Sequence, residues 1–166
     1  PFAGTSMDWL GSQKDRRNSG AGIKVAVLDT GIDSRHESLV GVNFREISLV
    51  EDKEQFGRGH GTGIASIIAG QMEGFLGLAP SSEILSVRVL GQDGEGDAFT
   101  IAKGIMMAVD QGADIINLSL GGTSSSVAID HAIGYASANE VLLVSAVGNE
   151  GVNQVAYPAR HNNVIA

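Results

Sequence analysis

Three polar side chains in this sequence have the types and settings that one acid–base reaction would need. Asp29 follows an unbroken apolar run, Val25–Leu28, and is followed at once by Thr-Gly. His60 stands between two glycines, and Asn149 comes shortly after the mainly apolar segment 141–146, within a Gly-Asn-Glu-Gly segment. A histidine held by a buried carboxylate is an oriented general base, and an Asn amide can stabilise a developing oxyanion. Together the three side chains predict a catalytic centre.

Each of these residues also has a simpler explanation. Asp29-Thr-Gly can merely turn the chain, and Gly-Asn149-Glu-Gly is a common turn composition. A lone histidine such as His60 at a helix start is usually a cap or a surface residue. The occurrence of all three at the ends or starts of successive predicted elements favours the catalytic interpretation.

The elements that must position these residues alternate between strand and helix along the chain. Such alternation predicts an α/β fold with a parallel β-sheet and helices on both of its faces. Groups at the carboxyl ends of such strands gather at the edge where open α/β sheets collect ligands. Strands are predicted at 23–28, around 41–44, at 84–90, 115–118 and 141–146, and helices at 60–74, 98–111 and 127–139.

Length and composition narrow the class of protein. The chain has 166 residues, enough for one well-buried core. We expect residues 1–22 to be a polar arm ahead of a domain at 23–166. A net charge of −8 argues against nucleic acid or an anionic membrane as partner. There is no cysteine for a disulfide or a thiolate metal site, and no apolar run approaches the roughly 20 residues of a membrane span.

Four segments resemble, in order and spacing, those of the subtilisin-like serine peptidases. Residues 25–33 resemble the catalytic aspartate segment of that family, and 59–62 resemble its histidine segment. Residues 117–122 are similar to its substrate-binding strand, and 145–151 to its oxyanion segment. The similarity continues through 157–159 and 164–166, so that it covers the chain from about residue 22 onwards. It implies the subtilisin-like three-layer fold and a serine endopeptidase.

The resemblance implies a role for each candidate residue. Asp29 would orient His60, and His60 would take a proton from a serine and pass it to the leaving amine. Asn149 would donate to the tetrahedral oxyanion. An extended peptide or protein would be the substrate, bound between two strand-like segments with side-chain pockets beside them. The implied substrate contacts are Leu90, Gly94, Glu95, Gly96, Ala98, Ile101, Ser119, Leu120, Gly121, Ala146, Val147 and Gly148.

The sequence departs from the family pattern at several positions. Gly63 replaces a second histidine that normally follows the first, and Glu37 replaces a proline after His36. The stretch 70–80 lacks the Asn-rich loop with which many members bind calcium. We therefore expect no required cofactor and leave structural calcium open. The resemblance implies an extracellular enzyme, with an intracellular one as the alternative.

The nucleophile is the residue that the sequence does not place. The chain ends at Ala166, before the family's Gly-Thr-Ser-Met-Ala segment, so we expect that serine on a C-terminal segment or a second chain. Gly4-Thr-Ser6-Met matches the motif at the wrong end, and an extended chain from Ser6 could span up to roughly 75 Å to Asp29. The family's serine opens a long apolar helix, however, whereas Asp-Trp-Leu-Gly follows here. We expect that Ser6 is not the nucleophile.

Two further functions compete with the peptidase. A catalytically inactive relative that binds peptides without cleaving them would explain Gly63 and the missing serine. The glycines of 57–61 echo a dinucleotide-binding loop, but that fingerprint should follow a strand, and the charged run 51–54 precedes it instead. The sequence therefore favours the peptidase.

Overall fold

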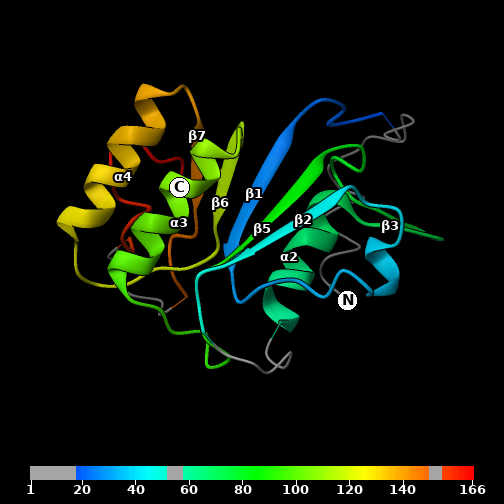
Figure 1. Ribbon diagram of the computed structural model, residues 1–166, viewed down its shortest axis with the longest axis horizontal. Coiled ribbons are helices and arrows are strands. Elements are labelled where there is room, and N and C mark those ends of the chain that lie inside the picture. The colour runs from blue at the N-terminus through cyan, green and yellow to red at the C-terminus, as the bar shows by residue number, and fades with distance from the viewer. Residues whose placement is uncertain (1–17, 52–57, 150–154) are drawn as a thin grey trace.

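A single parallel sheet forms the centre of the molecule (Figure 1). The computed structural model describes residues 18–51, 58–149 and 155–166. The five strands lie in the order β2-β5-β1-β6-β7, and every neighbouring pair is parallel, which confirms the predicted α/β fold class. Their bounds are β1 (Lys24–Asp29), β2 (Phe44–Ser48), β5 (Glu83–Arg88), β6 (Ile115–Leu118) and β7 (Leu142–Ser145).

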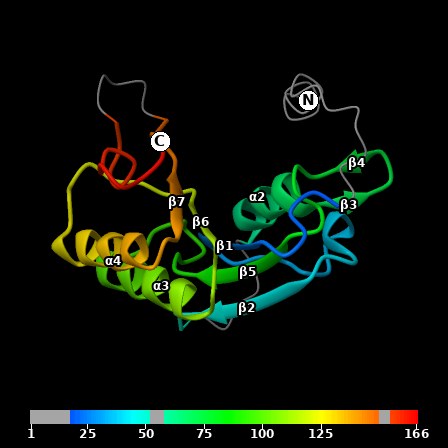
Figure 2. The same ribbon diagram turned by 90° about the horizontal axis from the view of Figure 1, so that it is seen from above.

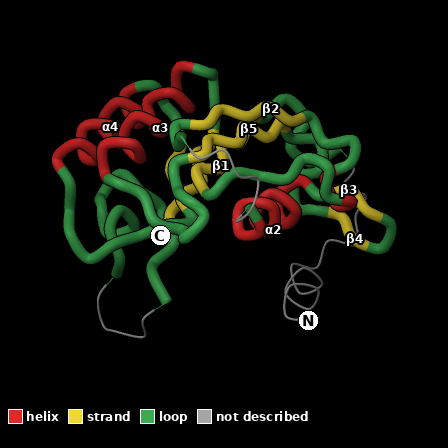
Figure 3. Tube along the Cα trace, turned by 60° about the horizontal axis from the view of Figure 1, so that its bottom comes forward, coloured by secondary structure: helices red, strands yellow, loops and turns green. Residues whose placement is uncertain are grey.

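Helices cover both faces of the sheet (Figures 2 and 3). Helix α2 (Gly59–Ala69) lies on one face, while α3 (Ala98–Asp110) and α4 (Val127–Ala138) lie side by side on the other. Because successive residues of a strand point to opposite faces, the buried run of β1 serves both layers. Its odd-numbered valines join the apolar cluster of α2, and its even-numbered residues join that of α3 and α4.

The chain order places the end of β1 at a change of direction in the sheet. From β1 the sheet first grows through β2 and β5 on one side. Helix α3 then carries the chain across to β6 and β7 on the other side. In open α/β sheets such a switch point leaves a crevice outside the carboxyl ends of the strands. Asp29, the last residue of β1, lies at that point.

The helix that contains His60 is shorter than predicted. It ends at Ala69 rather than near Gly74, and a hairpin of β3 (Gln71–Met72) and β4 (Phe75–Leu76) follows. Gly74 is the turn of this hairpin, with φ +78°, a conformation that only glycine adopts readily. The periodic apolar residues that suggested a longer helix therefore belong partly to the hairpin.

The face of α2 that packs on the sheet is made of small residues. Gly61, Ala65 and Ala69 are buried, whereas Ile67 and Met72, which were predicted to belong to the apolar face of the helix, are each 38% exposed. Small residues let the helix backbone approach the sheet closely, and this approach brings the start of α2 to the end of β1.

Other predicted boundaries are shifted by a few residues. The strand expected around 41–44 begins at Phe44, because Gly41 with φ +91° is a turn residue. A 3-10 turn, η1 (Glu37–Leu39), precedes it. Residues 18–22 form turns, and the rest of the predicted arm, with Ser6, lies outside the described residues. The remaining predicted helices and strands begin and end within two residues of the observed ones.

None of the helices in the described ranges is long and apolar enough to span a bilayer.

Two helical glycines allow a test of the packing. A Cβ on buried Gly104 of α3 would lie 2.5 Å from Cγ1 of Val89, which has no room to move, whereas a Cβ on exposed Gly134 of α4 would touch nothing. We expect Gly104→Ala to lower the free energy of unfolding by about 1–3 kcal/mol through overpacking. Gly134→Ala should raise it by about 0.5–1 kcal/mol, since alanine favours the helix. Urea titration of both variants measures these changes, and equal effects would contradict the described packing of α3.

Candidate active site

The two residues predicted to form an acid–base pair are in contact. The Asp29 side chain is fully buried at the end of β1, and its Oδ1 accepts hydrogen bonds from Thr30 N at 2.6 Å and Thr30 Oγ1 at 3.1 Å. His60 Nδ1 lies 2.8 Å from Asp29 Oδ2 and 3.0 Å from Oδ1. Since a carboxylate only accepts, Nδ1 carries the hydrogen and Nε2 of the neutral ring is the proton acceptor. The His60 side chain is 58% exposed, so it is accessible to a reactant.

The start of α2 is fitted against the loop that follows β1. A Cβ on Gly61 would collide with the carbonyl oxygen of Gly31 and come within 3.2 Å of Asp29 Oδ1. The Thr62 hydroxyl accepts from Asp33 N at 2.9 Å and donates to Arg58 O at 2.7 Å. Only a glycine next to His60 permits this approach, and the hydroxyl of Thr62 fixes it.

A cleft of about 750 Å³ opens beside His60 and contains most of the predicted substrate-binding residues. Thr30 and His60 lie in its wall. The loop after β5 and the start of α3 contribute residues to the cleft, and so does the segment after β6. The predicted residues that line it are Leu90, Gly94, Glu95, Gly96, Ala98, Ile101, Ser119, Leu120 and Gly121.

A second cavity, of about 500 Å³, shares the segment Ser119–Thr123 with this cleft. Ala146, Gly148 and Asn149 line it. Asn149 lines this second cavity and not the cleft that contains His60, and the segment Ser119–Thr123 forms part of the wall of both. Val147, predicted to contact substrate, lines neither cavity, and its carbonyl accepts from Ala156 N at 2.9 Å.

The segment around Tyr157 contributes residues to the walls of the site. The sequence analysis gave these residues no role. Tyr157 and Pro158 line the cleft, and Arg160 lines the second cavity. Two backbone hydrogen bonds between Tyr157 and Gly122, at 2.8 and 2.9 Å, hold this segment against the shared wall. The family resemblance of residues 157–159 was the one sequence signal for this segment. Local spacing in the sequence does not show that the segment folds back onto Gly122.

The polar groups of this segment are paired. Arg160 Nη2 donates to Thr123 O at 2.8 Å, and the guanidinium carbon lies 5.5 Å from the centre of the Tyr157 ring. The Tyr157 hydroxyl donates to Asp130 Oδ1 at 2.8 Å. Burial of the ring, and then the bond to Asp130, raise the pKa of Tyr157 well above its ordinary value. The phenol therefore stays neutral and acts as a fixed wall.

Asp97 fixes the start of α3 and with it one wall of the cleft. Its Oδ1 accepts from Phe99 N and Thr100 N, each at 2.9 Å, and its Oδ2 accepts from Thr100 Oγ1 at 2.6 Å. The Thr100 hydroxyl and these backbone groups lower the pKa of Asp97. The N-cap therefore stays ionised and holds Ala98 and Ile101 in place.

The fold and this geometry define a class of protein: an α/β protein with a buried carboxylate–imidazole pair beside a cleft of about 750 Å³. Residues 20–166 match the sequence profile of the subtilase family, Peptidase_S8. The chain belongs to the subtilase family.

Known relatives agree with this assignment. Subtilisin BL of Lederbergia lenta is 43% identical over 154 residues, 92% of this chain and 57% of the relative. Thermitase of Thermoactinomyces vulgaris is 41% identical over 152 residues, 89% of this chain and 54% of the relative. The chain thus spans little more than half the length of these relatives.

Solved structures share the fold. Sphericase superimposes with a TM-score of 0.81 at 30% identity, over 98% of this chain and 58% of its own. The protease domain of PatA gives a TM-score of 0.80 at 32% identity, over 93% of this chain and 58% of its own. The match to experimental structures confirms the subtilisin-like fold.

Within 18–51, 58–149 and 155–166, His, Asp and Glu side chains form no group of three or more that could hold an ion. The stretch 70–80, for which structural calcium was left open, contains the β3–β4 hairpin and has Glu73 as its one carboxylate. Calcium takes six to eight oxygen ligands, so this hairpin does not fit it.

Two glycines of α2 test the close approach. Gly61→Ala should push His60 away from Asp29 and lower kcat of the protein that contains this chain by about 10²-fold, the loss that a displacement of about 1 Å causes. Gly63→Ala is the matched control, because a Cβ there would touch nothing and the residue is exposed. It should leave kcat unchanged. A Gly61→Ala variant with normal kcat would contradict the described contact.

Proposed function

We propose that the protein containing this chain is a serine endopeptidase of the subtilase family, with its nucleophilic serine on a C-terminal segment or a second chain. The contact between His60 Nδ1 and the buried Asp29 carboxylate carries this proposal. It orients a base at the cleft. The proposed enzyme requires no cofactor.

In the proposed reaction His60 Nε2 takes the proton of the serine hydroxyl as the oxygen attacks the peptide carbonyl. Asp29 stabilises the imidazolium that results. The tetrahedral oxyanion would receive a hydrogen bond from the side-chain amide of Asn149. His60 then gives its proton to the leaving amine. Water attacks the acyl-enzyme in a second round of the same transfers and frees the serine.

The substrate would bind as an extended strand. The segments 94–96 and 119–121 face one cleft, and their backbone groups would pair with the peptide on either side. The side chain before the scissile bond would enter the second cavity, between Gly121, Ala146 and Gly148. A more distant side chain would contact Leu90, Ala98 and Ile101. We place the enzyme outside the cell, as the family resemblance implies.

A fluorophosphonate probe tests the proposal on the full-length protein. The probe should label one serine, and His60→Ala should abolish the labelling, because the hydroxyl is activated only through the imidazole. Mass spectrometry of the adduct then identifies the residue. A label on Ser6 would establish a permuted enzyme, and a peptide-binding protein without any label would overturn the proposed activity.

Asn149 and Asp29 should act on different steps of catalysis. Asn149→Ala should lower kcat by about 10²–10³-fold with KM nearly unchanged, a magnitude taken over from the equivalent donor in subtilisin itself. Asp29→Asn should lower kcat by about 10⁴-fold, because the imidazole loses its orientation and the imidazolium its stabilising charge. Steady-state kinetics on a peptide amide measures both. If either variant kept full activity, the role assigned to that residue would be wrong.

The second cavity predicts the cleavage preference. Its small walls should favour large apolar or aromatic side chains before the scissile bond, and the guanidinium of Arg160 should disfavour lysine and arginine. Arg160→Gln should raise the rate for lysine relative to leucine by about fivefold, the ratio that about 1 kcal/mol gives. A peptide library read out by mass spectrometry measures both proteins. Strict preference of the unmodified enzyme for basic residues would contradict the prediction.

A further inference from the structure

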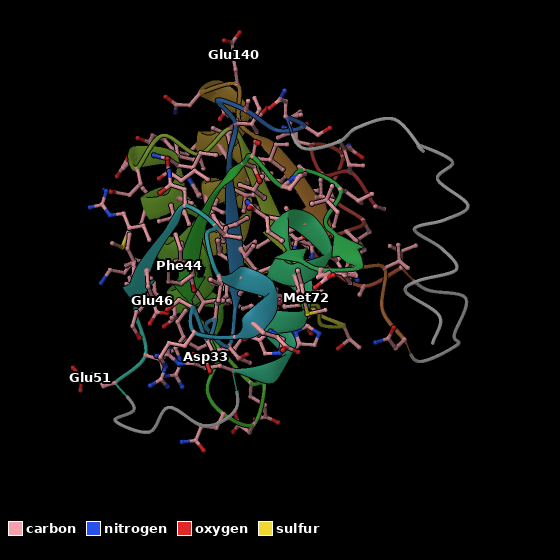
Figure 4. The ribbon with its side chains drawn as sticks, turned by 90° about the vertical axis from the view of Figure 1, so that its right-hand side faces the viewer. Asp33, Phe44, Glu46, Glu51, Met72 and Glu140 are labelled. Carbon is pink, nitrogen blue, oxygen red and sulfur yellow. The ribbon has the colours of Figure 1, made fainter. Side chains whose placement is uncertain are left out.

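An ion pair outside the cleft connects the elements that carry Asp29 and His60. Arg58, immediately before α2, donates from Nη1 to Glu46 Oε2 at 2.8 Å and to the carbonyl oxygen of Ile32 at 3.1 Å. Glu46 belongs to β2, and Ile32 to the loop after β1. Figure 4 labels Glu46 on that strand and Asp33 in the loop. One guanidinium nitrogen therefore joins β2 and the loop to the start of α2.

The rest of Arg58 strengthens the same connection. Its carbonyl oxygen accepts from the Thr62 hydroxyl, which itself accepts from Asp33 N. Its Cγ would lie 3.6 Å from a Cβ on Gly31, so that its methylene groups pack beside that glycine. The loop after β1 is thus held to α2 by the side chain and by the backbone of one residue.

The Asp29–His60 hydrogen bond depends on how these two backbones lie relative to each other. Ile32 closely follows Asp29 in the chain, and Arg58 closely precedes His60. Catalytic groups need to be held within about 0.5 Å of productive geometry. We propose that Arg58 and Glu46 are a positioning pair, which holds the start of α2 against the Asp29 loop and so keeps His60 Nδ1 on the Asp29 carboxylate. Neither residue lines the cleft. This inference rests on the proposed peptidase function.

A second ion pair in the sheet provides a matched control. Lys24 Nζ lies 3.5 Å from Glu83 Oε1 and donates to the carbonyl oxygen of Gln111 at 2.8 Å. The side-chain exposures are 22% and 31%, close to the 20% of Arg58 and 25% of Glu46. Lys24 and Glu83 are the first residues of β1 and β5, at the end of the sheet opposite to Asp29. Both cations therefore hold one carboxylate and one carbonyl, but only Arg58 does so next to the acid–base pair.

The test uses the full-length enzyme with Arg58→Met, Glu46→Gln, the double variant and Lys24→Met. We expect kcat of Arg58→Met and Glu46→Gln to fall about tenfold, part of the 10²-fold that a 1 Å misplacement causes, with KM unchanged. The double variant should be no slower than Arg58→Met alone, because the change at Glu46 acts only through the pair that Arg58→Met already removes. Arg58→Lys keeps a charge on Glu46 and should recover part of the lost kcat. Lys24→Met should lower the melting temperature and leave kcat unchanged.

The proton on His60 Nδ1 provides a readout that does not depend on turnover. Its NMR resonance, shifted downfield by the hydrogen bond to Asp29, should be present in the unmodified protein and in Lys24→Met and should weaken in Arg58→Met. If the unmodified protein had no activity, but the resonance still weakened in Arg58→Met and not in Lys24→Met, the proposed peptidase would be overturned and the positioning pair would be supported. An active enzyme whose kcat and resonance were unaffected by Arg58→Met would overturn the inference. A rise in KM at constant kcat, or an equal loss of kcat in Lys24→Met, would overturn it as well.

Discussion

The fully buried carboxylate of Asp29 is the constraint on which the rest of the site depends. A buried charge is costly unless hydrogen bonds compensate for the lost water. Here both donors of Thr30 and the imidazole of His60 supply them. The imidazole can reach Asp29 only if the first turn of α2 lies directly on the loop after β1. The glycine at position 61 and the small buried face of α2 follow from this requirement.

The parallel sheet and the contact between Asp29 and His60 could be predicted because their signals are local. The apolar run of β1 ends at Asp29, and His60 begins a helix, so each appears within a few residues of sequence. Alternation of strands and helices then brings the strand ends together. The end of α2 was predicted wrongly although the hairpin that follows it is equally local. Ile68, Met72 and the residues between them fit a helix, and only the turn at Gly74 and the pairing of β3 with β4 separate hairpin from helix.

Much of the cleft wall was predicted from family resemblance, and the part that was missed depends on distant contacts. Tyr157 and Gly122 pair across the cleft wall, and Arg160 reaches the carbonyl oxygen of Thr123. Nothing in the composition near Arg160 indicates that its guanidinium belongs to the pocket wall. The same holds for Arg58, whose partner Glu46 lies on an edge strand that the sequence placed imprecisely. The tertiary fold determines which groups such long side chains contact. The sequence between the two partners therefore contains no pattern that predicts the contact.

The glycines in the first turns of α2 lower the intrinsic stability of this helix. Gly59, Gly61 and Gly63 occupy its first turns, and a glycine in a helix interior costs about 1 kcal/mol relative to alanine. A Cβ atom would collide with neighbouring atoms only at position 61 of these three, because positions 59 and 63 face open space. Steric fit therefore explains Gly61 but not the other two glycines. A helix start weakened in this way needs support from outside the helix. The Thr62 hydroxyl and the Arg58 guanidinium provide it, because both attach the first turn to the loop that holds Asp29. The side chains that anchor this turn thus permit the glycine that the acid–base contact requires.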